Sequence, residues 1–192
     1  MSDAQEKSRK PRADSLRNRD HLLATAKNAF TEGGTGVALE EIARQAGVGI
    51  GTLYRHFPTR GALIAAVYQR EVEQLAQTAE RLLIEKPPVE ALEAWFEELT
   101  IYMATKRVLV PALRADPEEG PRAFAYSGPT IRQSLSLLIA AAAKAGEIRA
   151  DLDDEDVQRL LAGYAHGYDL PGWETGARRM VSILIAGLRS GR

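Results

Sequence analysis

The stretch that decides the fold is Leu39-Glu-Glu-Ile-Ala-Arg-Gln-Ala-Gly47-Val-Gly-Ile-Gly-Thr-Leu-Tyr54-Arg-His-Phe57. Its first apolar residues recur at i, i+3, i+4 and i+7, the spacing of one helix face: Leu39, Ile42, Ala43 and Ala46. Gly47 follows where a left-handed residue ends a helix. Two short helices joined by a tight turn predict a helix-turn-helix over about residues 38–57, whose second helix enters the major groove of DNA.

The second helix of this motif is amphipathic in a way that suits nucleic acid. At 100° per residue, Leu53 and Phe57 point inward, whereas Gly51, Thr52 and Arg55 fall opposite them. Tyr54 and His56 flank that outer face. Hydroxyl, guanidinium, phenol and imidazole groups reach base edges and phosphate oxygens, and Gly51 leaves room for close approach of the backbone. DNA binding is therefore the leading hypothesis.

A wider set of residues resembles the tetracycline-repressor (TetR) family of bacterial transcriptional regulators. The blocks are Arg19-Asp-His-Leu-Leu-Ala-Thr-Ala26-Lys-Asn-Ala-Phe30, Ala46-Gly-Val-Gly49, Gly51-Thr-Leu-Tyr-Arg-His-Phe57, Pro58-Thr-Arg60 and Leu63. The resemblance implies an all-α fold of about nine helices: a three-helix head, a long connecting helix, and a body for ligand binding and dimerisation. It also implies that Tyr54, His56 and Arg60 hold phosphates. The expected DNA-binding residues are Ile50, Gly51, Thr52, Tyr54, Arg55, His56 and Arg60.

Five positions depart from the family pattern. Val37 and Ala38 stand where the family often has hydroxyl residues that cap the first motif helix. Gly49 replaces a common Ser, Arg60 replaces the usual Lys, and Gly61 replaces a usual Glu. The departures leave the motif intact but weaken the case for a phosphate contact at the start of the first motif helix.

Charge and periodicity outline three segments. Residues 1–15 are polar and aperiodic, which predicts a flexible basic arm. Lys10 and Arg12 in it either solubilise the chain or follow the DNA backbone or minor groove. Residues 16–76 form the expected DNA-binding domain, with a first helix from about Leu16 to Glu32, and residues 77–192 the body. Residues 1–60 contain ten Lys or Arg against seven Asp or Glu, and the rest contains fifteen against nineteen, so the basic end coincides with the motif.

Apolar spacing predicts a connecting helix over about 60–85 and body helices over about 89–105, 108–114, 130–145, 153–168 and 174–189. The Pro- and Gly-rich stretch from Ala115 to Pro129 is expected to be a long loop, either a gate over a pocket or a plain surface loop. Asp151 to Asp156 resemble the start of a calcium loop, but they lack its central Gly and distal Glu. The favoured interpretation is that Asp153 to Asp156 lie at a helix N-terminus, where carboxylates stabilise the helix dipole and cap the helix.

The body helices carry apolar stripes that serve either as plain core or partly as the lining of a ligand cavity. A cavity for a small, mostly apolar molecule needs a few polar groups for orientation. The candidate residues are Trp95, Phe96, Leu99, Tyr102, Met103, Leu113, Arg114, Tyr126, Leu138 and His166.

The last two expected helices have the apolarity of an oligomer surface, the alternative being packing on the chain's own body. Two such helices from each of two copies would form a four-helix interface with two-fold symmetry, which suits two half-sites in DNA. The candidate interface residues are Leu161, Tyr164, Tyr168, Met180, Val181, Leu184 and Leu188.

Composition narrows the function classes. The chain of 192 residues has no cysteine and three histidines, and it lacks a nucleophile elbow, a phosphate-cradling glycine loop and a run of about 18 apolar residues. We therefore expect a cytoplasmic protein that is not an enzyme, with no cofactor and no metal. Its expected partners are double-stranded operator DNA, a small-molecule effector and a second copy of itself, with no membrane. The leading interpretation is a repressor released from a pseudo-palindromic operator by that effector. The alternatives are a constitutive, ligand-blind DNA-binding protein and a helical small-molecule-binding protein or enzyme.

Overall fold

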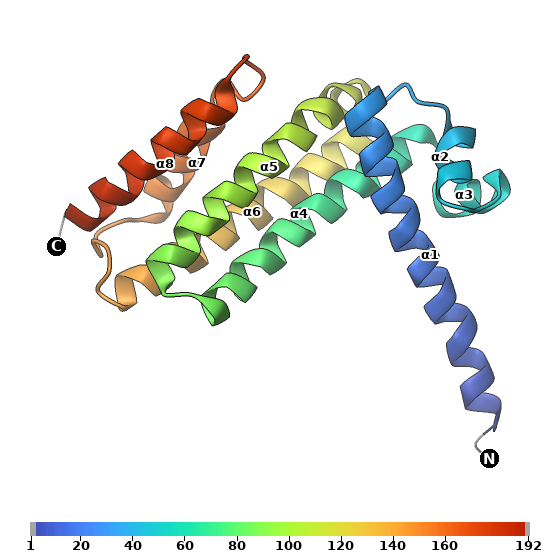
Figure 1. Cartoon of the computed structure of the whole chain (residues 1–192), viewed down its shortest axis with the longest axis horizontal. Coiled ribbons are helices and arrows are strands. Elements are labelled where there is room, and N and C mark those ends of the chain that lie inside the picture. The colour runs from blue at the N-terminus through green and yellow to red at the C-terminus, as the bar shows by residue number, and fades with distance from the viewer. Residues whose placement is uncertain (1–2, 191–192) are drawn as a thin grey trace. The chain divides into compact units, whose positions relative to one another are not determined.

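The computed structural model describes the backbone of residues 3–190 and the side chains of residues 17–189. Over this part of the chain it contains eight helices and no strand, so the predicted all-α class is confirmed (Figure 1). None of these helices combines the length and apolarity that crossing a bilayer requires. The helices are α1 Asp3–Gly33, α2 Leu39–Gln45, α3 Ile50–His56, α4 Arg60–Glu85, α5 Pro88–Ala115, α6 Glu119–Lys144, α7 Asp154–Ala165 and α8 Trp173–Ser190.

The chain forms two compact units. Unit 1 comprises the chain up to Tyr68 together with Val108–Gly120, and unit 2 comprises Gln69–Arg107 together with the chain from Pro121 onward. Three long helices, α4, α5 and α6, contribute residues to both units. The boundary expected after residue 76 falls inside α4.

The core of unit 1 comes from the predicted inward faces of α1, α2 and α3. The side chains of Leu22, Phe30, Ile42 and Leu53 have no exposed surface. Gly47 has φ +65°, and Val48 N donates to Ala43 O across it at 3.0 Å, which ends α2 and turns the chain toward α3. Burial of these apolar residues fixes α3, because that helix has only seven residues and cannot be stable alone.

Helix α1 begins much earlier than expected. It starts at Asp3 rather than near Leu16, so the backbone of residues 3–15 is helical and not the flexible arm that the sequence predicted. Residues 4–10 consist mostly of good helix formers, which favours this extension. Residues 1–2 and the side chains of Lys10 and Arg12 lie outside the described residues.

The prediction of a long loop between Ala115 and Pro129 is wrong. Helix α5 runs unbroken to Ala115 with Pro111 inside it, and α6 starts at Glu119 and continues through Pro129. Asp116 Oδ1 accepts hydrogen bonds from the backbone N of Glu118 at 3.0 Å and of Glu119 at 2.9 Å, which caps the first turn of α6. Pro121 lies in that first turn, where the missing N–H removes no helical hydrogen bond.

Unit 2 contains most of α4 and α5 and nearly all of α6, together with α7 and α8. Trp95 of α5 is fully buried, and its indole Nε1 donates to Leu75 O of α4 at 3.0 Å. Helices α7 and α8 lie side by side near the C-terminus (Figure 1). Asp153 and Asp156 form a reciprocal capping box at the start of α7, which confirms the capping interpretation of this acidic run.

Candidate DNA-binding surface and the faces of the body

Helix α3 presents a polar face to solvent and is held in place by buried apolar residues on its opposite face. Leu53 is fully buried and Phe57, directly after the helix, is 2% exposed. Tyr54, at 44% exposure, and Arg55 are exposed, and Thr52 and His56 are half-buried. Of the other two predicted positions, Ile50 is half-buried and Gly51 is exposed, with open space where a Cβ would lie. Among the predicted DNA contacts, these six share one short helix.

Arg55 and Thr52 are linked in the free protein. Arg55 Nη2 donates to Thr52 Oγ1 at 2.9 Å, and its Nε donates to Gly51 O at 3.1 Å. The guanidinium therefore lies along the exposed face of α3. Its remaining donors are suited to a guanine edge or a phosphate.

Arg19 of α1 is a cation that the sequence analysis did not select. Its guanidinium lies over the Phe57 ring, 5.5 Å from the centroid, and the side chain is exposed. Arg19 precedes the buried Leu22 by three residues, so both lie on the helix face that meets the motif. The three-residue spacing from Leu22 was the sequence signal that could have identified Arg19.

Acidic side chains of α2 are paired within the helix. Glu41 accepts hydrogen bonds from Arg44 at 2.6 and 2.8 Å and from Gln45 at 2.7 Å. The bond from Arg44, followed by that from Gln45, lowers the pKa of the Glu41 carboxyl from 4.5 to about 2. Glu41 is therefore ionised and paired at neutral pH.

Arg60 belongs to α4 and not to α3. It is half-buried at the start of α4, and its Nη1 donates to Thr35 O at 2.9 Å and to Val37 O at 2.5 Å. Its side chain is thus engaged with the turn between α1 and α2.

The predicted ligand-pocket residues do not converge on one hollow. Seven are buried: Trp95, Phe96, Leu99, Tyr102, Met103, Leu113 and Leu138. Three are exposed: Arg114, Tyr126 and His166. Leu113 and Arg114 belong to unit 1, whereas the other eight belong to unit 2. Of all ten, Met103 borders an open hollow of about 340 Å³ on α5, α6 and α7, together with Leu161.

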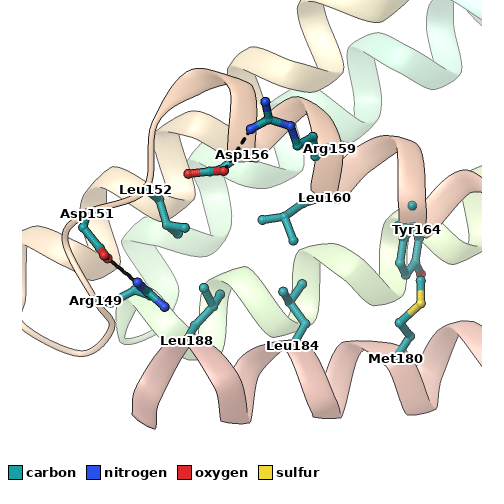
Figure 2. Close-up of a pocket in the computed structure, with 11 residues that line it drawn as sticks. Arg149, Asp151, Leu152, Asp156, Arg159, Leu160, Tyr164, Met180, Leu184 and Leu188 are labelled. Atoms are coloured by element: carbon teal, nitrogen blue, oxygen red, sulfur yellow. Dashed lines mark hydrogen bonds and ion pairs between the residues drawn. The ribbon is translucent and has the colours of Figure 1, made fainter. Parts of the chain in front are cut away.

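A larger groove of about 540 Å³ lies on α7, α8 and the segment before α7 (Figure 2). Leu160, Met180, Leu184 and Leu188 face it, as Figure 2 shows. Ion pairs lie toward one end: Arg149 with Asp151 at 2.5 Å and Arg159 with Asp156 at 3.2 Å. The hydrogen bond from Arg149 lowers the pKa of Asp151 to about 2.

Tyr164 closes the inner end of this groove and ties α7 to α5. It is 2% exposed, and its hydroxyl donates to Phe96 O at 3.1 Å and lies against the Thr100 hydroxyl. Its ring packs on Phe96 at 5.1 Å and on Trp173 at 5.5 Å between centroids. Burial raises the pKa of the phenol above its usual 10.

The predicted interface residues divide by the direction in which they point. Tyr164, Val181 and Leu188 are buried within the chain and therefore offer little surface to a partner. Leu161, Tyr168 and Leu184 are half-buried, and Met180 is 39% exposed. Ile183, which the prediction did not include, is 72% exposed on the outer face of α8. Its position three residues after Met180, on the same helix face, was the sequence signal that could have identified it.

Comparison with known proteins covers both ends of the chain. Residues 22–67 match the family described as bacterial regulatory proteins, tetR family, and residues 87–190 match the transcriptional regulator SbtR-like, C-terminal domain. A TetR transcriptional regulator of Streptomyces coelicolor has a similar structure, with a TM-score of 0.77 and 44% identity over 89% of this chain and 98% of that one. A TetR transcription regulatory protein of Mycobacterium vanbaalenii has a TM-score of 0.76 and 36% identity over 93% and 98%.

A curated relative is similar over a shorter stretch. An HTH-type transcriptional regulator of Staphylococcus aureus is 34% identical over 79 residues, which is 40% of this chain. The chain spans about two fifths of the length of that relative.

Proposed function

The chain belongs to the TetR family of bacterial transcriptional regulators, which are DNA-binding transcription factors and not enzymes, and from this premise we propose that it is a dimeric repressor released from its operator by a small molecule. The observation that carries the DNA-reading part is the exposed polar face of α3 over the buried Leu53. Thr52 and Arg55 are the proposed base-facing residues, and Tyr54 and His56 the proposed phosphate contacts.

The outer face of α8 supports a homodimer. Met180, Ile183 and Leu184 expose apolar surface, and they follow one another at the spacing of one helix face. An apolar face of this kind is stable in water when another helix covers it. A second copy packed here about a two-fold axis gives two recognition helices, which read two half-sites of a pseudo-palindrome.

Release by an effector is supported by hollows on unit 2. The hollow beside Met103 and Leu161 is open to solvent, apolar over much of its lining, and formed by α5, α6 and α7. A molecule that binds it in only one arrangement of the dimer shifts the population away from the arrangement that fits successive major grooves.

The test is fluorescence anisotropy of a labelled duplex from upstream of the chain's own gene, over a salt series and against a scrambled duplex. The proposal expects tight, salt-sensitive binding to the first duplex only. Equal, weak binding to both contradicts regulation of its own gene.

The effector is sought by adding a small-molecule library to the bound complex. A releasing compound should lose its effect on Ala162→Trp, which fills the hollow, while that variant still binds the duplex. If the same compound releases both proteins equally, the hollow is not the effector site. If no compound releases the DNA, the constitutive, ligand-blind alternative is favoured.

A further inference from the structure

We propose that Arg60 is a positioning residue of the DNA-binding head: its guanidinium holds the turn before α2 and thereby fixes the backbone that leads into a helix without a hydroxyl cap. The proposal rests on the DNA-binding function of the head. It assigns Arg60 a role through α2 and α3, in place of the phosphate contact that the family resemblance implies.

The first observation is the pair of hydrogen bonds that Arg60 makes across the sequence. Both hydrogens of Nη1 are committed, one to Thr35 O at 2.9 Å and one to Val37 O at 2.5 Å. These acceptors are 25 and 23 residues away in the chain, so the bonds join the start of α4 to the turn between α1 and α2. Charge-assisted bonds that are partly shielded from water are among the stronger ones in proteins.

The second observation is the weakness of the turn itself. Its backbone forms a long hydrogen bond of 3.4 Å, from Val37 N to Gly34 O. The N-cap of α2 is Ala38, whose methyl group accepts no hydrogen bond from the first turn. Helix α2 has seven residues and carries the packing partner of α3, so a poorly fixed start would move the recognition helix.

The third observation concerns the position of Arg60 on its own helix. A cation in the first turn of a helix is opposed by the helix dipole. The neutral carbonyls of Thr35 and Val37 offset that cost, because they give the guanidinium a set of acceptors outside α4. A residue used solely for its charge would gain nothing from this arrangement.

The start of α4 is also fixed from a second direction. A Cβ at Gly61 would lie 2.0 Å from Asp116 Oδ2, so the capped turn between α5 and α6 occupies the space that a side chain would take. Gly61 therefore marks a close approach of these two segments. The first turn of α4 is itself capped, because Ala62 N donates to Thr59 Oγ1 at 3.0 Å. Because the start of α4 is fixed, the hydrogen bonds from the Arg60 guanidinium restrain the turn before α2.

The experiment compares four full-length proteins on one selected duplex: wild type, Arg60→Gln, Ala38→Ser, and the double variant that carries both changes. Ser at position 38 supplies the missing cap. We expect Arg60→Gln to weaken binding about five- to ten-fold with the same dependence on salt, and the double variant to regain most of that loss. Arg81→Gln removes one cation from an exposed site on unit 2 and serves as the control for loss of charge, with wild-type affinity expected.

A phosphate contact predicts a different pattern. Losing one contact in each head lowers the slope of log K against log salt by about 0.9 per phosphate, and Ala38→Ser restores nothing. That result would overturn the proposal. Arg60→Lys gives a second comparison, because it keeps the charge and loses the planar fork: the proposal expects weaker binding, whereas a phosphate contact expects near wild-type binding.

Amide hydrogen exchange without DNA provides an independent readout. The proposal expects faster exchange at Ile42 and Ala43 in Arg60→Gln and recovery in the double variant, whether or not an operator has been found. Unchanged exchange in α2 would contradict it. If Arg60→Gln does not fold, the Arg60→Lys protein carries the same exchange measurement.

Discussion

Helices α3 and α8 are built alike and differ in what they leave exposed. Each buries one face within its own unit, Leu53 in α3 and Val181 with Leu188 in α8, and each presents the opposite face to solvent. The outer face of α3 carries Tyr54 and Arg55, whereas the outer face of α8 carries Met180 and Ile183. The buried face of each helix therefore fixes its position in the fold, and the chemistry of its exposed face determines which partner can bind.

This contrast gives each helix a distinct proposed role. Hydrogen-bonding and cationic groups on a seven-residue helix suit a polyanion with readable base edges. Branched and flexible apolar groups on an 18-residue helix suit a second copy of the same surface. Changing the polarity of either outer face should therefore abolish binding of its partner and leave the fold unchanged.

The largest expected effect follows from a charge on α8. Ile183→Glu places a carboxylate where the second copy is expected to pack, and desolvating it should prevent dimerisation. Losing the second head should reduce operator affinity by about 100-fold or more. Analytical ultracentrifugation and anisotropy measure the two consequences.

Ile84→Glu is the matched control, because Ile84 is 86% exposed on α4 and lies outside α8. It should remain dimeric and bind normally. A dimeric Ile183→Glu protein would remove α8 from the interface.

The second effect concerns the outer face of α3. Arg55→Ala removes the donors that are proposed to reach base edges, and it also frees Thr52 Oγ1. We expect the preference for the cognate base pair to fall by about 10-fold or more, with a smaller loss on unrelated duplexes. Anisotropy with single-position variants of the selected duplex measures it. If the loss were equal for every sequence, Arg55 would be a phosphate contact and the base-facing assignment would be wrong.

The sequence was sufficient for the head because local signals and packing agree there. Leu39, Ile42 and Leu53 have the spacing of inner faces, and Gly47 adopts the left-handed conformation that its position predicted. Connecting helix α4 has the predicted bounds, Arg60–Glu85. The role of Arg60 could not be read in the same way, since its acceptors are backbone carbonyls more than 20 residues away.

Prolines misled the prediction in the body. Pro121 and Pro129 suggested a long loop, yet Pro121 lies in a first turn and α6 continues through Pro129. Apolar spacing likewise could not separate residues that pack inside the chain from residues that remain exposed. Val181 and Ile183 are both apolar and two positions apart, but the first is 5% exposed and the second 72%.

A smaller effect is expected on the inner side of α7. Tyr164→Phe removes the hydrogen bond to Phe96 O and should lower the free energy of unfolding by about 1 kcal/mol at neutral pH. Because burial raises the folded-state pKa of the phenol, its contribution is present below pH 10 and is lost as pH rises through the raised value. Denaturant titrations at pH 8 and above pH 10 should show a steeper alkaline loss in wild type than in Tyr164→Phe. Parallel losses would contradict this assignment.

The smallest effect is expected at Glu41. Its folded-state pKa of about 2 lies below the usual 4.5, so its contribution is present above pH 4.5 and is lost as pH falls toward 2. Glu41→Gln should reduce the acid sensitivity of the head in that window and leave DNA affinity at pH 7 nearly unchanged. Thermal melts from pH 5 to pH 2.5 measure it, and identical acid profiles would show that the pair with Arg44 contributes nothing.

The central claim is that two α3 helices of one dimer read two half-sites. Selection of duplexes from a random pool, followed by hydroxyl-radical footprinting of the tightest one, tests it most directly. The account predicts an inverted repeat with two protected segments on one side of the duplex, whose centres are separated by about 34–36 Å or a multiple of that distance. A single protected half-site, or no enriched sequence, would contradict it.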